Sequence, residues 1–191
     1  MTGGGKLATY IMTRSRKRFD LETVNVQAVD LDDIAYALAH INRYTGHVGT
    51  YCVLEHSIHV TECALDLAAG QVGAQEAARE SICHDMAEAY TGDVSTPVKR
   101  LLGERFLELE SRVDRAIRAK FKLATPSAYS RQVMHKADRM VTHAEALHFL
   151  GHEAQDWAVN PWSGFRPFGR WRRYKRVDEF LDLCKSLGVH A

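Results

Sequence analysis

The chain of 191 residues has the length of one domain, and we expect a single domain over residues 1–191 whose core forms without disulfides or a structural metal. Its 25 Lys and Arg against 24 Asp and Glu give a formal net charge of +1, which excludes an overall attraction to nucleic acid or to an anionic membrane. No apolar run has the length that spans a bilayer, and the start of the chain lacks the apolar core of a secretion signal. We therefore expect a cytoplasmic protein whose residues 1–5 are disordered.

The first expected elements are a short hairpin and an amphipathic helix. Two extended runs around a polar centre, between Tyr10 and Phe19, predict the small N-terminal β-hairpin. Apolar residues spaced three and four apart then run from Leu31 to Ile41 and predict a helix that Asp30 caps.

Two more helices are expected before the middle of the chain. Glycines interrupt residues 44–52, after which the apolar period predicts a helix over residues 53–69 that ends at Gly70. The next helix is expected over residues 74–90, with Gly92 as a left-handed cap after its end.

The rest of the chain is also expected to be helical. Thr96 and Pro97 have the residue types of an N-cap and a first helical residue. The other expected elements are long helices with apolar stripes over residues 106–121 and 133–147, an irregular aromatic segment over residues 152–169, and a last helix over residues 171–187. Because strands do not alternate with helices, the sequence predicts an all-α helical bundle.

The four cysteines are scattered without a CxxC pair. Three of them lie within segments that have the apolar period of buried helices. We expect Cys52, Cys63, Cys83 and Cys184 to be reduced core residues and not a disulfide framework.

A cluster of imidazoles and carboxylates is the main chemical signal. His84, Asp85 and Glu88 are spaced to share one face of the helix expected over residues 74–90. Taken alone, an adjacent His-Asp pair more often means a hydrogen-bonded surface pair. His56 and Asp138, each inside another apolar-periodic helix, complete two imidazoles and two carboxylates. Such a mixed set suits one divalent ion, Mn, Fe, Co, Ni, Zn or Mg, and leaves an octahedral ion positions for water and substrate.

These residues carry a resemblance to the HD superfamily of metal-dependent phosphohydrolases, whose pattern is H…HD…D. The segments "EHS", "HDMAEAYTGDVSTPVK" and "KAD" resemble the three motifs of bacterial 5′-deoxynucleotidases, in order, within residues 31–150. The segments "TRSRKRFDL" and "DLDDIAYALAHINRYTGH" are similar to small HD proteins of phages and prophages. The resemblance implies an HD-domain helical bundle with an aromatic and basic C-terminal part over residues 152–188.

The resemblance also implies roles for individual residues. It makes His56, His84, Asp85 and Asp138 the metal ligands. Glu88 would then position or deprotonate the attacking water, as a carboxylate beside a metal can. In the same family Asp93 would meet the sugar hydroxyl of a nucleotide.

Further residues are expected to bind the substrate. Arg43 and Lys99 are the candidate cations for phosphate. Tyr44 stands where the deoxynucleotidases have Trp, which leaves base preference and phosphate-chain length open. Thr96 belongs to the same expected wall of the site.

Other histidines have weaker claims. His59 follows the expected ligand His56 by three residues, while His135 and His143 bracket Asp138. We expect these three as hydrogen-bond partners or surface residues and not as ligands.

Three functions remain open at this level. The leading one is a 5′-deoxynucleotidase that releases phosphate from deoxynucleoside 5′-monophosphates by attack of a metal-bound water. The alternative is a deoxynucleoside triphosphate triphosphohydrolase that releases tripolyphosphate. The third is a nucleotide- or nucleic-acid-binding module that uses the basic run from Arg166 to Arg176, although a solvated helix face or an oligomer contact is the more common meaning of such a run. The expected partner is a nucleotide, and relatives suggest a homo-oligomer, a dimer or larger.

Overall fold

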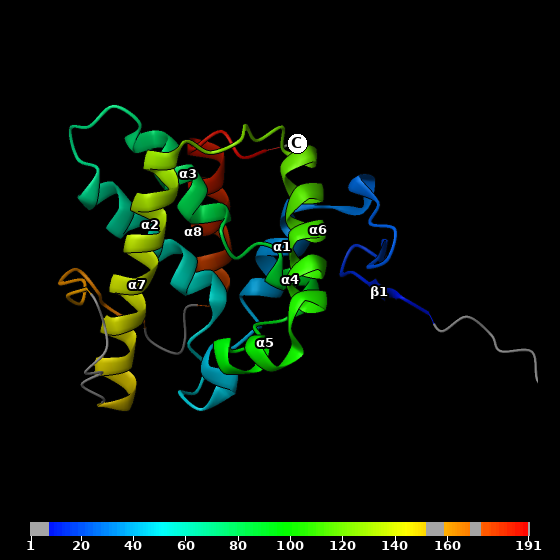
Figure 1. The fold of residues 1–191 in the computed structure, drawn as a ribbon, viewed down its shortest axis with the longest axis horizontal. Coiled ribbons are helices and arrows are strands. Elements are labelled where there is room, and N and C mark those ends of the chain that lie inside the picture. The colour runs from blue at the N-terminus through cyan, green and yellow to red at the C-terminus, as the bar shows by residue number, and fades with distance from the viewer. Residues whose placement is uncertain (1–7, 152–158, 169–172, 191) are drawn as a thin grey trace, which may run out of the picture.

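The computed structural model describes residues 8–151, 159–168 and 173–190, and the described part is mainly helical (Figure 1). The elements are β1 (Tyr10–Met12), β2 (Arg18–Asp20), η1 (Val26–Ala28), α1 (Leu31–Leu38), η2 (Tyr44–Gly46), α2 (Val53–Leu67), α3 (Ala74–Cys83), α4 (Glu88–Thr91), α5 (Thr96–Leu102), α6 (Glu104–Lys120), α7 (Ala128–Leu150) and α8 (Arg173–Ser186). An all-α bundle with a small hairpin is confirmed.

The hairpin pairs β1 with β2 in antiparallel register, with Ile11 opposite Phe19. Phe19 is fully buried and stacks on Tyr90, so the hairpin covers one end of the helical core. Asp33 of α1 accepts hydrogen bonds from the backbone and the hydroxyl of Ser15 in the hairpin turn. The hairpin is therefore attached to the bundle by both apolar packing and hydrogen bonds.

Helices α2, α3 and α7 pack against one another, with α8 behind them (Figure 1). Helix α4 contacts both α1 and α6. The main apolar core joins α1, α2, α3, α6 and α8 and includes Ile34, Leu54, Ile82, Ile117 and Phe180. A second apolar cluster lies between α2 and α7. The four cysteines are buried and free, as the sequence predicts.

Some predicted boundaries hold and others do not. Asp30 caps α1, as predicted, by accepting from the backbone N–H groups of Asp32 and Asp33, whereas α7 extends beyond the predicted residues 133–147 at both ends and is followed by Gly151 in the left-handed conformation. The helix predicted over residues 74–90 is wrong, because α3 ends at Cys83. Residues 84–87 continue as a tighter turn with bonds to the third preceding residue, such as Glu88 N–H to Asp85 C=O at 3.0 Å.

Two predicted caps also differ in detail. Gly92 has positive φ, but its φ of 80° and ψ of 158° lie outside the left-handed helical region. The helix α5 already includes Thr96, so its N-cap is Ser95 and the predicted N-cap was one residue late.

Part of the C-terminal run lies outside the described residues. The structure does not describe residues 169–172 of the basic segment, which include the predicted helix start at Trp171. Arg176 is buried and forms an ion pair with Glu179 at 3.3 Å, so this one member of the run is not a solvated side chain. No helix in the described ranges has both the length and the apolar character that crossing a membrane requires.

Candidate metal centre

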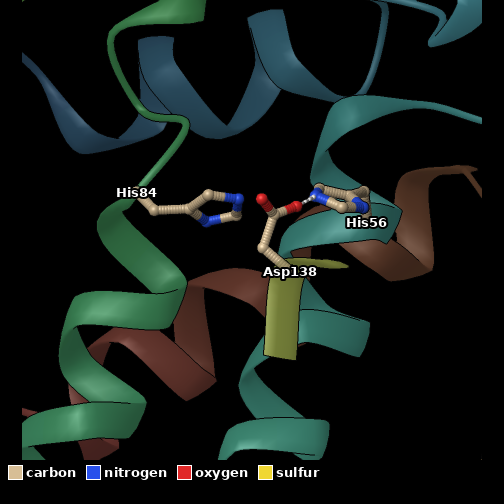
Figure 2. Close-up of side chains that lie close together, drawn as sticks. All are labelled: His56, His84 and Asp138. Atoms are coloured by element: carbon tan, nitrogen blue, oxygen red, sulfur yellow. Dashed lines mark ion pairs between the residues drawn. The ribbon is translucent and has the colours of Figure 1, made fainter. Parts of the chain in front are cut away.

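Three segments bring the predicted ligands together. His56 comes from the first half of α2, His84 and Asp85 come from the turn after α3, and Asp138 comes from the middle of α7. His56, His84 and Asp138 each offer one ligand atom, and these atoms lie within 4.8 Å of one another. Figure 2 shows the Asp138 carboxylate between the two imidazoles.

Asp85 completes the group from the other side. Its Oδ2 lies 3.1 Å from His84 Nε2 and 3.6 Å from His56 Nε2. His56 Nε2 in turn lies 3.2 Å from Asp138 Oδ1. The structure therefore brings together all four of the residues that the sequence suggested as a ligand set.

The hydrogen bonds of the imidazoles decide which nitrogen faces the centre. His84 Nδ1 lies 2.7 Å from the carbonyl oxygen of Ser81, and His56 Nδ1 lies 2.6 Å from Glu145 Oε1. Because both partners are acceptors, each Nδ1 carries a proton, and each ring directs its Nε2 to the centre, where a neutral ring offers a lone pair.

The residues present fit a divalent cation. Both Nε2 atoms are buried, and neither makes a hydrogen bond among the described residues. When both rings are neutral, their two buried lone pairs and the two carboxylates form a set of acceptors without a donor, which a cation in place of the imidazole protons satisfies. The mixture of nitrogen and oxygen donors suits a transition metal ion.

Burial and neighbouring charges keep the ligand carboxylates ionised. Burial opposes ionisation of Asp138, but the hydrogen bond and charge of His56 outweigh it and lower the pKa of Asp138 to about 2. Asp85 is also buried, and the adjacent His84 imidazole lowers its pKa below the ordinary value. Both side chains are therefore anionic at neutral pH.

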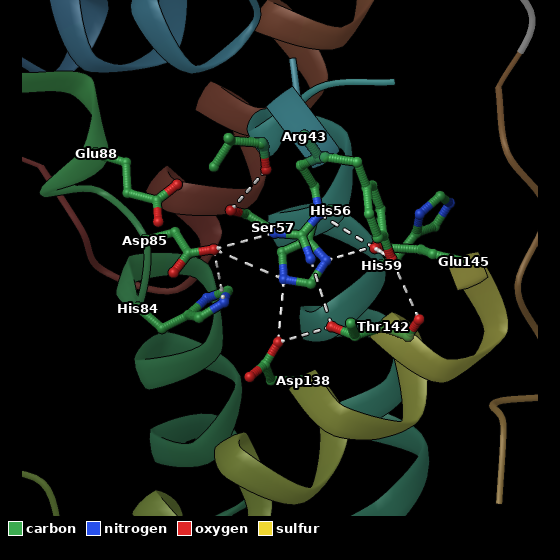
Figure 3. Close-up of polar contacts among 12 residues, drawn as sticks. Arg43, His56, Ser57, His59, His84, Asp85, Glu88, Asp138, Thr142 and Glu145 are labelled. Atoms are coloured by element: carbon green, nitrogen blue, oxygen red, sulfur yellow. Dashed lines mark hydrogen bonds and ion pairs between the residues drawn. The ribbon is translucent and has the colours of Figure 1, made fainter. Parts of the chain in front are cut away.

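Glu88 has the opposite electrostatics. It is 6% exposed and faces Asp85 across the site (Figure 3), and its Oε2 makes no hydrogen bond among the described residues. Burial, followed by repulsion from Asp85 and Asp93, raises the pKa of Glu88 to about 9. A divalent cation beside Glu88 would favour its ionised form, which is the form of a general base.

A cavity of about 580 Å³ opens beside this group. Its walls include all five residues that the sequence suggested for substrate binding, which are Arg43, Tyr44, Asp93, Thr96 and Lys99. Glu88, Asp85 and Asp138 line the same cavity, and the volume lies in the range of small-molecule sites.

The cations of this cavity differ in how far they are already paired. Arg43 Nε donates to Glu145 Oε2 at 3.1 Å, and Lys99 Nζ lies 2.8 Å from Glu110 Oε1. Arg139, which sequence reasoning missed, also lines the cavity; it is exposed, and no ion pair joins it to any residue in the described part of the chain. Its position directly after Asp138 was the available signal.

Glu145 is the other residue that sequence reasoning missed. Asp138, Thr142 and Glu145 are spaced by four and then three residues, which places them on one face of α7. This polar stripe inside an apolar-periodic helix was the available signal. Burial opposes ionisation of Glu145, but Arg43 and His56 lower its pKa to about 2.

The other histidines lie away from the centre. His59 is buried, with Nδ1 3.0 Å from the Tyr51 hydroxyl and Nε2 3.2 Å from the carbonyl oxygen of Arg166. His135 is exposed, and His143 Nδ1 lies 2.9 Å from the carbonyl oxygen of Val159. None of the three belongs to the group of ligand atoms in the described structure.

Comparison with known proteins gives the family of this chain. A family model described as 5′-deoxynucleotidase YfbR-like matches residues 33–152, a span that contains all four candidate ligands. The chain is 32% identical over 136 residues to YfdR of Escherichia coli (strain K12), which is described as uncharacterized; the match covers 69% of this chain and 71% of that protein. It is 32% identical over 142 residues to an uncharacterized protein of Rhodobacter capsulatus, with 72% of this chain and 71% of that protein covered. The chain therefore belongs to the YfbR-like 5′-deoxynucleotidase family, within the HD-type hydrolases.

Proposed function

We propose that this protein is a divalent-metal-dependent 5′-deoxynucleotidase that converts deoxynucleoside 5′-monophosphates to deoxynucleosides and orthophosphate. The observation that carries the proposal is the convergence of His56, His84, Asp85 and Asp138 beside a buried Glu88, at the wall of a cavity of about 580 Å³. Family membership supports the reaction class.

The ligand residues and Glu88 would divide the chemistry between them. A bound divalent ion supplies Lewis-acid polarisation of a phosphoryl oxygen and lowers the pKa of water. Glu88 accepts a proton from the attacking water, whose oxygen forms the new bond to phosphorus. The bond between phosphorus and the O5′ atom breaks, and O5′ leaves as the hydroxyl of the deoxynucleoside by taking up the proton that Glu88 accepted from water.

The cavity residues would hold the rest of the nucleotide. Asp93 lines the cavity, and burial raises its pKa above the ordinary value. A carboxylate there can accept a hydrogen bond from a sugar hydroxyl. The ring of Tyr44 lines the same cavity while its hydroxyl donates to Glu145, which fixes the orientation of the ring.

The charges of the cavity support a monophosphate over a triphosphate. Arg43, Lys99 and Arg139 face four lining carboxylates, which are Asp85, Glu88, Asp93 and Asp138. Two of these cations are already paired, with Glu145 and Glu110 respectively. Little positive charge is left to neutralise the additional anionic groups of a triphosphate.

The test is hydrolysis of a panel of deoxynucleoside and ribonucleoside mono- and triphosphates with Mn²⁺, Co²⁺ or Mg²⁺, with the products identified. We expect orthophosphate from the deoxynucleoside monophosphates. Glu88→Gln should lower kcat by ~10²–10⁴-fold, the usual contribution of a general base, while it keeps the metal. Glu110→Gln is the matched control, since Glu110 also contacts Lys99 but does not line the cavity.

Two results would contradict the proposal. Release of tripolyphosphate from triphosphates would assign a triphosphohydrolase. Absence of metal-dependent turnover of every substrate, with steep salt-dependent binding of nucleotide or nucleic acid, would assign a binding module.

A further inference from the structure

A single buried carboxylate joins the metal centre to the substrate wall. Glu145 is 0% exposed, and each of its two oxygens accepts two hydrogen bonds (Figure 3). Oε1 receives His56 Nδ1 at 2.6 Å and the Tyr51 hydroxyl at 2.8 Å. Oε2 receives Arg43 Nε and the Tyr44 hydroxyl, each at 3.1 Å. One oxygen therefore accepts a hydrogen bond from a candidate metal ligand, and the other accepts hydrogen bonds from two residues of the cavity.

We infer that Glu145 is a positioning residue that couples metal binding at His56 to substrate binding at Arg43 and Tyr44. The substrate half of this inference rests on the proposed function, since Tyr44 is placed beside the nucleotide there and Arg43 lines the same cavity. The metal half rests only on the contact of Glu145 with His56.

Only an ionised carboxylate can satisfy this arrangement. All four groups around Glu145 are donors, and a carboxylate accepts at both oxygens. An amide of the same shape has one accepting oxygen and one donating nitrogen, so it must present N–H groups to donors on one side. With no solvent exposure, water cannot replace the lost bond. Replacement by Gln therefore breaks hydrogen bonds on one side directly, and the coupling predicts that the other side weakens with it.

Arg43 extends the link to two more candidate ligands. Its Nη2 donates to Thr142 Oγ1 at 3.4 Å, and Thr142 Oγ1 donates to Asp138 Oδ1 at 3.3 Å. Its Nη1 lies 3.9 Å from Asp85 Oδ2. The position of the guanidinium is thus defined by contacts on the metal side of the cavity.

The backbone that carries Arg43 and Tyr44 needs such support. Tyr44 and Thr45 have positive φ values of 55° and 50°, which cost free energy in residues other than glycine. The segment is held by the backbone bond from Arg43 N–H to the carbonyl oxygen of Tyr51 at 2.9 Å and by the two side-chain bonds to Glu145. Loss of the carboxylate should therefore shift this wall of the cavity.

The test compares Glu145→Gln with the matched control Glu80→Gln. Glu80 is also a buried carboxylate, 5% exposed, and pairs with Arg118 outside the cavity. Metal affinity is measured without substrate, from the visible absorption of bound Co²⁺ or from the electron paramagnetic resonance signal of free Mn²⁺. Substrate affinity is measured as KM and as inhibition by orthophosphate, both at saturating metal.

We expect Glu145→Gln to weaken metal binding ~10–100-fold, as loss of a partner of a metal-binding histidine does. It should also raise KM and the inhibition constant of orthophosphate, and Glu80→Gln should change none of these quantities. Tyr44→Phe keeps the ring and the charge of Glu145 and provides a second variant if Glu145→Gln does not fold. It should weaken metal binding about twofold to tenfold through loss of the hydrogen bond to Glu145, although Tyr44 does not contact a candidate ligand.

Distinct results separate failure of this inference from failure of the proposed function. If folded Glu145→Gln or Tyr44→Phe binds metal and orthophosphate as the wild type does, the coupling is refuted whatever the substrate is. If the wild type hydrolyses no nucleotide but Glu145→Gln still weakens both metal and orthophosphate binding, the coupling stands and the proposed function fails.

Discussion

The pKa values of individual side chains in this site depend on their neighbours more than on their residue type. Glu88 and Asp138 are both buried carboxylates, yet the pKa of Glu88 is raised to about 9 and that of Asp138 is lowered to about 2. The difference arises because Asp138 faces imidazoles, whereas Glu88 faces Asp85 and Asp93. The pair therefore divides into a permanent anion and a group that can exchange a proton.

The raised pKa of Glu88 predicts a pH effect on the stability of metal-free protein. Between pH 4.5 and about 9 the unfolded chain releases the Glu88 proton that the folded chain keeps, so this group lowers stability as pH rises. Glu88→Gln removes the penalty. In thermal melts with a chelator at pH 8 it should raise Tm by about 2–4 °C or more, equivalent to ~1 kcal/mol in a chain of this size. At pH 4.5 the two proteins should melt together, and a larger difference there than at pH 8 would contradict the assignment.

Arg139 is predicted to bind the phosphate in addition to Arg43. It lines the cavity beside Asp138, whereas Arg43 and Lys99 are engaged by carboxylates. Arg139→Ala should raise KM for a monophosphate about tenfold, the size of one charge-assisted hydrogen bond, with little change in metal affinity. Lys136→Ala, an exposed cation of α7 outside the cavity, is the control and should leave KM unchanged. Equal increases in KM for the two substitutions would show that any nearby positive charge favours binding and would contradict a specific role of Arg139.

At the scale of elements, the break between α3 and α4 shapes the centre. The α-helix ends at Cys83, and the tighter turn over residues 84–87 places His84 and Asp85 toward α2 and α7 while Glu88 begins α4. Gly92 ends α4 with positive φ, and the next residue, Asp93, lines the same cavity as Glu88. The segment from the end of α3 to Asp93 therefore supplies two of the four candidate ligands, the candidate base and the candidate sugar contact.

Gly92 offers a prediction about this geometry. Its φ of 80° and ψ of 158° belong to a region that is almost restricted to glycine, and no atom lies within 4 Å of a Cβ placed there. Gly92→Ala should therefore cost ~1–3 kcal/mol through backbone strain alone and should raise KM by displacing Asp93. Gly103 has similar angles, φ 71° and ψ −159°, and similar open space, but does not line the cavity. Gly103→Ala should cost the same stability and leave KM unchanged, as urea unfolding and steady-state kinetics can show.

At the scale of the whole molecule, the candidate metal centre joins three packed segments. His56 on α2, His84 and Asp85 after α3, and Asp138 on α7 connect elements that are far apart along the chain. A metal ion there binds only the folded state, because the unfolded chain does not hold these residues together. Metal binding should therefore stabilise the entire bundle.

Metal addition gives a measurable shift in melting temperature. A metal concentration of about 100 times Kd should add ~2.7 kcal/mol and raise Tm by about 5–10 °C over the chelated protein. Asp138→Asn should lose most of this shift. Asp178→Asn, an exposed carboxylate on α8, should keep it. An unchanged shift in Asp138→Asn would place the binding site elsewhere.

The sequence by itself determined the helical class, the hairpin, the reduced cysteines and the residue types of the ligand group, because apolar period, caps and motif spacing are local properties. It failed at Cys83, since local propensity does not mark where an α-helix tightens into a turn. Only the tertiary structure decided that Glu145 binds His56, 89 residues away, and Arg43, 102 residues away. It also decided which cations are already paired. Hydrogen bonds, burial and pKa shifts depend on which distant side chains meet in a low-dielectric interior, and packing of the whole chain sets those contacts.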